Sequence, residues 1–164
     1  MVIHKKALTT PNLTVGDAVE EALCFGWIDS TGRRLDEHRS LLYIAPRKAG
    51  SGWSAVNKRR LEGLQAAGLL AAPGLACIEA AIHDGSWLRL DAAHALEVPP
   101  DLRAALEHAG EAATYWNAFP ASAQRALLEW ISNAKTDSTR KRCVRATAEG
   151  AARGERANQW RKKV

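Results

Sequence analysis

The sequence predicts an α+β fold, in which a small N-terminal hairpin or sheet with packed helices precedes an all-helical C-terminal part. Two observations favour this class. Before residue 50, apolar, β-branched and aromatic runs flank a polar stretch rich in turn residues, which is typical of a hairpin. After Val98-Pro99-Pro100, apolar residues recur at helical spacing. We read this proline pair as a linker and expect an α+β part over 1–97, a helical part over 98–154, and a basic tail over 155–164 that frays.

The first elements are a strand and a helix. Residues 2–6 resemble the beginning of a first strand. Residues 15–25 are predicted to be helical, because apolar residues recur there at helical spacing. Thr14 and Asp17 form a variant of the capping box at the start of this helix, and Gly26 ends the pattern.

A hairpin is expected next. Its strands are predicted at 27–29 and 41–45, where apolar and aromatic residues concentrate. The polar residues 30–32 are interpreted as a turn, and residues 33–37 as a long charged tip. Pro46 ends the second strand, because proline has no N–H for the ladder.

The remaining elements are predicted from caps, apolar stripes and helix breakers. They are a helix from Ser54 to Gly68, a helix from Pro73 to Gly85, a short strand at 87–90, helices with stripes at 102–106 and 112–119, a helix capped by Ser122, and a helix opened by Asp137 or Ser138. We expect the core to contain the large apolar residues of these elements: Val19, Leu23, Trp27, Ile44, Trp53, Leu61, Leu64, Ile78, Ile82, Trp116, Phe119, Leu127, Trp130, Ile131 and Val144.

Composition excludes several classes of protein. The chain has 164 residues, of which 46% are hydrophobic and 25% charged, so it is neither a disordered chain nor a collagen-like fibre. No apolar run approaches the roughly 20 residues of a membrane span. The net charge of +5 is unevenly distributed, since residues 131–164 carry ten Lys and Arg against three Asp and Glu. Such a cluster is typical of an anion-binding face or of a solvated tail.

The cysteines indicate a reducing compartment. Cys24, Cys77 and Cys143 are odd in number and form no Cys-x-x-Cys pair, so we interpret them as small buried thiols rather than a disulfide scaffold. Residues 1–6 do not resemble a signal peptide, because their apolar stretch is too short. We therefore expect a cytoplasmic protein.

Known catalytic and metal-binding motifs are absent from the sequence. It contains no Gly-x-Ser-x-Gly elbow, Walker loop, Gly-x-Gly-x-x-Gly or His-Glu-x-x-His segment. None of the five histidines lies four residues from another or beside a cysteine. We therefore predict neither a metal site nor a cofactor.

Residues beside two turns form the best candidate for a binding surface. They are Trp27 and Asp29 on the hairpin and Arg47, Lys48, Ser51, Trp53, Ser54 and Asn57 on the loop and helix that follow. A guanidinium and an indole next to a helix N-terminus can bind an anion or a ring. In the alternative interpretation, Trp53 closes the hairpin onto the next helix, and Arg47 pairs with Asp29 or Asp36.

These residues resemble the YdeI/OmpD-associated protein family, also called bacteriocin-protection proteins. The resemblance rests on Glu21-Ala22-Leu23-Cys24-Phe25-Gly26-Trp27-Ile28-Asp29, on Pro46-Arg47-Lys48 with Ser51-x-Trp53-Ser54-x-x-Asn57, and on Trp130-Ile131-x-x-Ala134-Lys135-x-x-x-Thr139-Arg140. It covers the chain from Val2 to about Gly154. It implies that Lys135, Thr139 and Arg140 share family motifs with the residues above, and it provides no catalytic residue.

Three functions remain open at this point. The first is a non-enzymatic binding or interaction protein whose basic surfaces engage an anionic ligand or protein, with nucleic acid as a less supported partner. The second is an enzyme acting on a small anionic metabolite, with Asp29 as the acid or base and with Arg47 and Asn57 orienting the substrate. In the third, the same three residues form a purely structural network that pins the hairpin to the helix.

Overall fold

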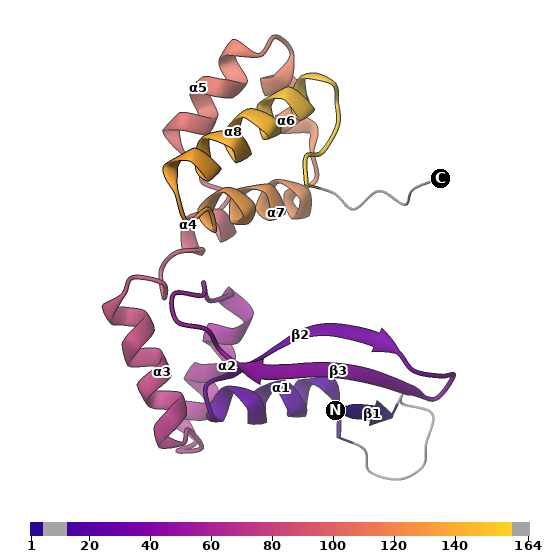
Figure 1. The fold of residues 1–164 in the computed structure, drawn as a ribbon, viewed down its shortest axis with the longest axis vertical. Helices are drawn as coiled ribbons and strands as arrows, with labels where there is room; N and C mark the ends of the chain where they lie inside the picture. The colour runs from indigo at the N-terminus through magenta and orange to yellow at the C-terminus, as the bar shows by residue number, and fades with distance from the viewer. Residues whose placement is uncertain (5–12, 159–164) are drawn as a thin grey trace. The chain divides into compact units, whose positions relative to one another are not determined.

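A computed structural model describes residues 1–4 and 13–158 of the chain (Figure 1). The chain divides into two units, Met1–Trp87 and Leu88–Val164. The described residues form one three-stranded sheet and eight helices. The α+β class with a helical C-terminal part is therefore confirmed. Residues 88–97, which precede the proline linker, belong to the helical unit, and Ala93 lies in its core.

The sheet of the first unit is antiparallel. It contains β1 (Val2–His4), β2 (Trp27–Arg34) and β3 (Arg39–Pro46) in the order β1-β3-β2. The hairpin is confirmed, and its first strand is longer than expected: the polar residues 30–32 lie within β2, next to an irregularity in the register between Asp29 and Gly32. β1 confirms the predicted first strand over residues 2–4, and residues 5 and 6 lie outside the described residues.

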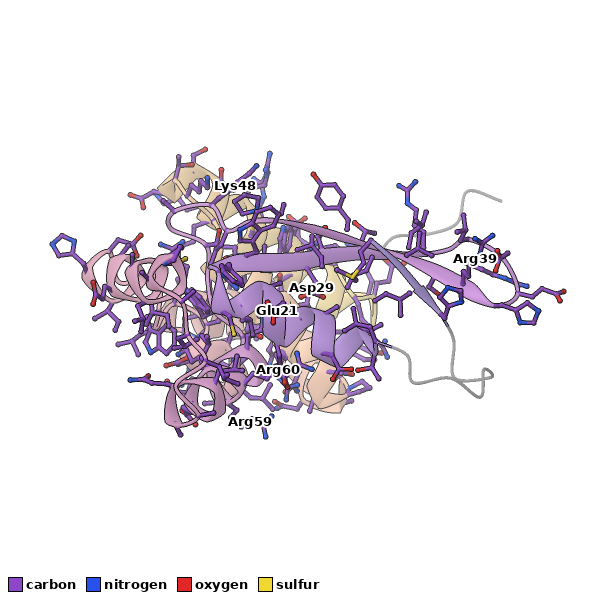
Figure 2. All side chains as sticks on the ribbon, turned by 90° about the horizontal axis from the view of Figure 1, so that it is seen from below. Glu21, Asp29, Arg39, Lys48, Arg59 and Arg60 are labelled. Atoms are coloured by element: carbon purple, nitrogen blue, oxygen red, sulfur yellow. The ribbon has the colours of Figure 1, made fainter. Side chains whose placement is uncertain are left out.

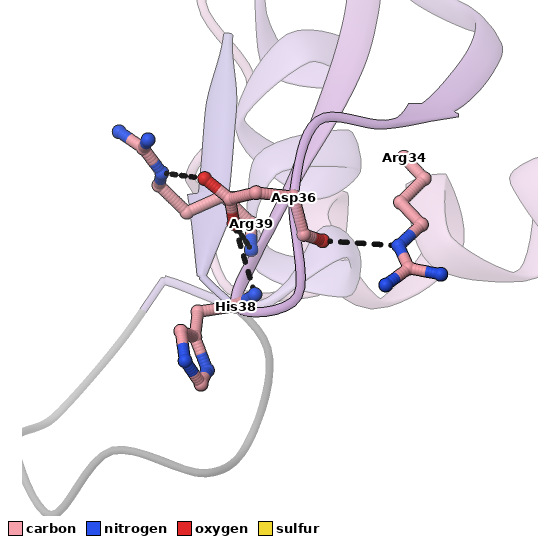
Figure 3. A network of polar contacts seen from close by, with 4 residues as sticks. All are labelled: Arg34, Asp36, His38 and Arg39. Carbon is pink, nitrogen blue, oxygen red and sulfur yellow. Dashed lines mark hydrogen bonds and ion pairs between the residues drawn. The ribbon is translucent and has the colours of Figure 1, made fainter.

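The hairpin turns at Asp36, so β2 continues to Arg34 and β3 begins at Arg39. The Asp36 carboxylate accepts hydrogen bonds from the backbone N–H groups of His38 and Arg39 and from Arg39 Nε, the last at 2.6 Å (Figure 3). Arg34 Nε donates to the Asp36 carbonyl. The hydrogen bond from Arg39 is the main cause that lowers the pKa of the Asp36 carboxyl. An aspartate that satisfies the backbone in this way favours a tight turn.

Three helices complete the first unit: α1 (Val15–Cys24), α2 (Ala55–Ala66) and α3 (Ala72–His83). The capping box of Thr14 and Asp17 is confirmed, and Ser54 caps α2 by accepting from Asn57 N–H. The core gathers residues of the sheet, of all three helices and of the loop before α2: Ile3, Ala18, Val19, Leu23, Cys24, Leu42, Trp53, Leu61, Leu64 and Ala81. Two of the residues expected in the core are exposed instead, Trp27 at 42% and Ile82 at 59%.

α1 and α3 approach each other closely at two glycines. A Cβ on Gly74, in the first turn of α3, would overlap the carbonyl of Cys24 at the end of α1. Gly26 has a φ of +73°, and a Cβ there would lie 2.9 Å from Cys77 Cβ. Glycine at both positions lets the turn from α1 into β2 lie against α3.

The second unit is a helical bundle. Its helices are α4 (Asp91–His94), α5 (Pro100–His108), α6 (Ala112–Ala118), α7 (Ala121–Ser132) and α8 (Asp137–Ala152). Its core includes Leu102, Trp116, Leu128, Ile131 and Ala151. None of the described helices is both long and apolar enough to span a bilayer.

Three details of the second part of the chain differ from expectation. Residues 87–90 are a turn that leads into α4, so the short strand predicted there is wrong. Pro120 occupies the cap position of α7, one residue before the helix begins, so Ser122 does not cap it. α8 begins at Asp137 as predicted, but Thr136 supplies its cap.

The residues that follow α8 contact it over the described part of the tail. Glu155 N–H donates to the Gly150 carbonyl, and Ala157 packs against the helical core. Gly150 permits this approach, since a Cβ there would lie 3.0 Å from the Glu155 carbonyl oxygen. The predicted fraying over 155–164 otherwise falls on residues 159–164, which lie outside the described residues.

Candidate functional site

Arg47 is the first residue of the loop that connects β3 to α2. Its backbone N–H donates to the Gly26 carbonyl at 3.0 Å, which fixes the loop against the turn between α1 and β2. The next residues form a tight turn, because both the N–H and the hydroxyl of Ser51 donate to the Lys48 carbonyl. The backbone thus places the Arg47 side chain beside the end of this loop.

The Arg47 guanidinium stacks on Trp53. Its central carbon lies 3.7 Å from the indole centroid, and Nη1 donates to the Gly52 carbonyl at 3.0 Å. Trp53 is only 1% exposed and packs against Trp87 with ring centroids 5.1 Å apart. The stacking holds the Arg47 cation in a largely buried position. The attraction between the cation and the ring stabilises this position, but the loss of water destabilises it unless the guanidinium also has hydrogen-bond partners.

Four buried polar atoms in this region have no hydrogen-bond partner among the described residues. They are Arg47 Nε, Arg47 Nη2, Trp53 Nε1 and Ser86 Oγ, each with less than 1 Å² of exposed area. Ser86, like Trp53, is 1% exposed. Folded proteins satisfy the large majority of such atoms, so a cluster of them calls for an explanation.

The three residues that carry these atoms line one cavity of about 160 Å³. The loop after β3 forms one wall, and the last turns of α3 with the residues after it form the other. The lining residues are Arg47, Lys48, Ala49, Gly50, Ser51, Trp53, Cys77, Ala80, Ala81, Asp84 and Ser86. Asp84 ties the two walls together, because its carboxylate accepts from the N–H groups of Gly50 at 3.1 Å and Ser86 at 2.8 Å.

The electrostatics of the cavity follow from burial. Burial lowers the pKa of the Arg47 guanidinium, an effect that Cys77 and Asp29 oppose. Burial raises the pKa of the Cys77 thiol, and the charge of Arg47 opposes it in turn. The site therefore holds a desolvated cation and a protonated thiol at neutral pH. A negative group in the cavity would offset part of the desolvation of Arg47.

The structure brings together half of the predicted site residues of this unit. Arg47, Lys48, Ser51 and Trp53 line the cavity, and Trp27, Asp29, Ser54 and Asn57 do not. Trp27 is exposed on the sheet, and Asp29 is half-buried on β2, where it lies opposite Ile44. Figure 2 shows Asp29 on its strand and Lys48 on the loop.

Ser54 and Asn57 serve the start of α2. Ser54 Oγ accepts from Asn57 N–H at 3.2 Å, and Asn57 Oδ1 accepts from Arg60 Nη1 at 3.4 Å. Asn57 is buried at 8% exposure. Their contacts explain why these two polar residues stand at the helix end.

Lys135, Thr139 and Arg140 belong to the helical unit and have separate surroundings. Arg140 binds the Asp101 carboxylate through Nε at 2.7 Å and Nη2 at 3.0 Å, which joins α8 to the first turn of α5. This hydrogen bond is the main cause that raises the pKa of Arg140 and lowers that of Asp101. Thr139 N–H donates to Thr136 Oγ1 at 3.2 Å in the cap of α8, and Thr139 Oγ1 accepts from the Thr136 hydroxyl at 3.0 Å. Lys135 is exposed.

Sequence reasoning missed the whole other wall, whose lining residues are Cys77, Ala80, Ala81, Asp84 and Ser86. In this segment the sequence indicated only that a helix ends at Gly85, and nothing in the spacing relates that position to Arg47. Within residues 1–4 and 13–158, no three His, Cys, Asp or Glu side chains gather as a metal site.

Comparison with protein families finds one match in each half of the chain. Residues 95–154 match the family described as Bacteriocin-protection, YdeI or OmpD-Associated. This match lies within the helical unit and covers less than half of the chain. The resemblance seen in the sequence is thereby confirmed over this range, which contains Lys135, Thr139 and Arg140. Outside it, residues 1–77 match a different model, described as a domain of unknown function, DUF8412.

The cavity residues Arg47 to Cys77 therefore fall in the DUF8412 match, outside the range that matches the YdeI/OmpD-associated model. Asp84 and Ser86 lie between the two matched ranges. No curated protein and no solved structure matches the chain.

Proposed function

We propose that this chain is a non-enzymatic binding protein for an anionic partner, and that the cavity beside Arg47 receives the partner's negative group. The observation that carries the proposal is the cluster of four buried polar atoms around one cavity, for which the described residues offer no partner. Each such atom costs about 1–3 kcal/mol of stability when it stays unpaired. An acceptor-rich anion would pair with several of them at once.

The other functions have less support. An enzyme with Asp29 as its acid or base requires Asp29 and Arg47 in one pocket, and Asp29 is not among the residues that line the cavity. The protonated state of the Cys77 thiol gives no support to a cysteine nucleophile either. A purely structural role for Arg47 explains its bond to the Gly52 carbonyl but not its two unpaired nitrogens.

The basic residues of the C-terminal part support an anionic macromolecule only as a secondary partner. Several of them are already paired, as Arg140 is with Asp101 and Arg153 with Glu155. If nucleic acid binds, its affinity should fall linearly on a log–log plot against salt concentration, because counterions are released. We propose that this binding takes place in the cytoplasm, because the three cysteines are free.

The proposal is tested by thermal shift with small anions at constant ionic strength. Wild-type protein should gain melting temperature with at least one anion, and Arg47→Met should lose that gain. Arg59→Met is the matched control, because Arg59 is an exposed arginine on α2 outside this cavity. Equal loss of the gain in both variants, or its retention in Arg47→Met, would contradict the proposal.

A further inference from the structure

The cavity also specifies a class of ligand. We infer that it takes a small monocarboxylate, held by the Nε and Nη2 edge of Arg47. This inference rests on the proposed function and narrows it. It follows from the edge of the guanidinium that is left unpaired, from the charges of the wall, and from the size and apolar character of the remaining lining.

The unpaired edge of Arg47 has the geometry of a carboxylate receptor. Nη1 already donates to the Gly52 carbonyl, so Nε and Nη2 are the nitrogens that remain. Their N–H bonds run nearly parallel, which matches the two oxygens of a carboxylate. The chain contains this arrangement once already, where Arg140 Nε and Nη2 bind the two oxygens of Asp101.

Trp53 and Ser86 each carry a further unpaired donor, and both donors favour a ligand rich in acceptor oxygens. Both residues are 1% exposed, and Trp53 Nε1 and Ser86 Oγ lack a partner among the described residues. A carboxylate has about four lone-pair positions, so it can accept from these donors while it pairs with Arg47. All four unpaired atoms expose less than 1 Å² each, so we expect the guanidinium to rotate in its stack on Trp53, and the side chains of Trp53 and Ser86 to shift, as the ligand enters.

The charges of the wall favour a single negative charge. Arg47 and the exposed Lys48 are cationic, and Asp84 is anionic, so the lining carries a net charge of about +1. A dianion such as sulfate or hydrogen phosphate would face the Asp84 carboxylate across a space of about 160 Å³. Like charges at such short range repel strongly where water is partly excluded.

The rest of the lining fits a short apolar chain. It includes Ala49, Ala80, Ala81 and Trp53, together with Gly50 and the thiol of Cys77. The Ser51 hydroxyl, which also belongs to the lining, already donates to the Lys48 carbonyl. An apolar cavity of roughly 150 Å³ accommodates a benzene ring. Propionate, butyrate and benzoate therefore span the sizes that the cavity of about 160 Å³ should accept.

Cys77 provides a local readout of occupancy. It lines the cavity and is half-buried, whereas Cys24 and Cys143 are buried at 5% and 1% exposure. A thiol reagent should therefore label Cys77 first in the folded protein, and Cys77→Ser identifies its signal. A ligand in the cavity should slow that labelling.

The experiment measures Cys77 labelling and melting temperature of the full chain with propionate, butyrate, benzoate, propionamide, sulfate and phosphate. Monocarboxylates should slow labelling and raise the melting temperature, and neutral propionamide should do neither. Arg47→Lys keeps the charge but loses the paired N–H groups, so carboxylate affinity should fall at least tenfold. N-acetylalanine and its amide test whether a peptide C-terminus can supply the carboxylate, since only the free acid should then compete with propionate.

The outcomes separate the inference from the proposed function. Protection by sulfate or phosphate that equals or exceeds that by carboxylates, and that depends on Arg47, overturns the carboxylate inference and leaves the binding proposal standing. Unchanged affinity in Arg47→Lys overturns the paired geometry. If no probe protects Cys77 and Arg47→Met only lowers the melting temperature, Arg47 is structural and both ideas fall.

Discussion

At the scale of single residues, Arg47 shows how one side chain can serve the fold and still retain capacity for a ligand. Its stacking on Trp53 and its bond to the Gly52 carbonyl hold the loop before α2. Its Nε and Nη2 atoms form no hydrogen bond with the described residues. The sequence predicted Arg47 and Lys48 as candidate site residues but did not predict Ser86. Ser86 lines the same cavity only because α3 packs against the rest of the unit.

Glycine substitutions test the close approach of α1 and α3. Gly74→Ala should destabilise the first unit by about 1–3 kcal/mol, because its Cβ would overlap a backbone carbonyl that cannot easily move. Gly63→Ala is the matched control: this glycine lies in α2 with no atom within 4 Å of the added Cβ, so it should stabilise by about 0.5–1 kcal/mol. Urea unfolding measures both. Similar free energies of unfolding for the two variants would mean that the contact is not tight.

At the scale of elements, caps and breakers in the sequence located the helices well. Thr14 with Asp17, Ser54 and Pro73 each stand at or next to the start of a helix of the structure. The segment 87–90 was misassigned because alternation over four residues also arises in a turn. The length of β2 was missed because Ser30 and Gly32 are typical of turns, whereas in the structure Gly32 pairs with Leu42 beyond the register irregularity and the hairpin turns only at Asp36.

The ion pair between α5 and α8 gives a prediction about pH. The hydrogen bond from Arg140 lowers the pKa of Asp101 in the folded state. Its contribution to stability is therefore present above the ordinary value of 3.8 and is lost as pH falls through the lower folded pKa. Both side chains are more than a third exposed, so solvent screens the pair, and Asp101→Asn should cost about 0.5–1 kcal/mol at pH 7.

Urea unfolding across pH measures this effect. The difference between wild type and Asp101→Asn should shrink below pH 3.8. Glu107→Gln is the control, because Glu107 is an exposed carboxylate on the same helix, away from its first turn. A difference between wild type and Asp101→Asn that persists unchanged in acid would show that the ion pair is not its source.

At the scale of the whole molecule, the chain contains two units with separate cores. The buried cluster of the sheet unit and that of the helical unit share no residue. The two family matches likewise cover different ranges. The helical periodicity after the prolines predicted the second unit, but the cavity of the first could not be predicted, since its walls come from residues 47–53 and 77–86 and meet only after folding.

Truncation of a core side chain should lower mainly the stability of the unit that contains it. Leu102 is fully buried in the helical core, so Leu102→Ala should cost about 2–5 kcal/mol there. Leu23→Ala is the counterpart in the sheet unit, where Leu23 is 1% exposed. Hydrogen exchange resolved by peptide should show faster exchange in the unit that carries the substitution. Equal acceleration in both units by either variant would show that they unfold as one.

The long hairpin has a consequence for how the sheet unit responds to stress. From Gly32 to the tip β2 is exposed, whereas β3 pairs on its other side with β1 over residues 39–41, and Ile3 of β1 lies in the core. The contacts of Asp36 close this tip (Figure 3). Because β1 joins the hairpin to the core that also contains Trp53, strain on the tip of the hairpin should reach that core through Ile3.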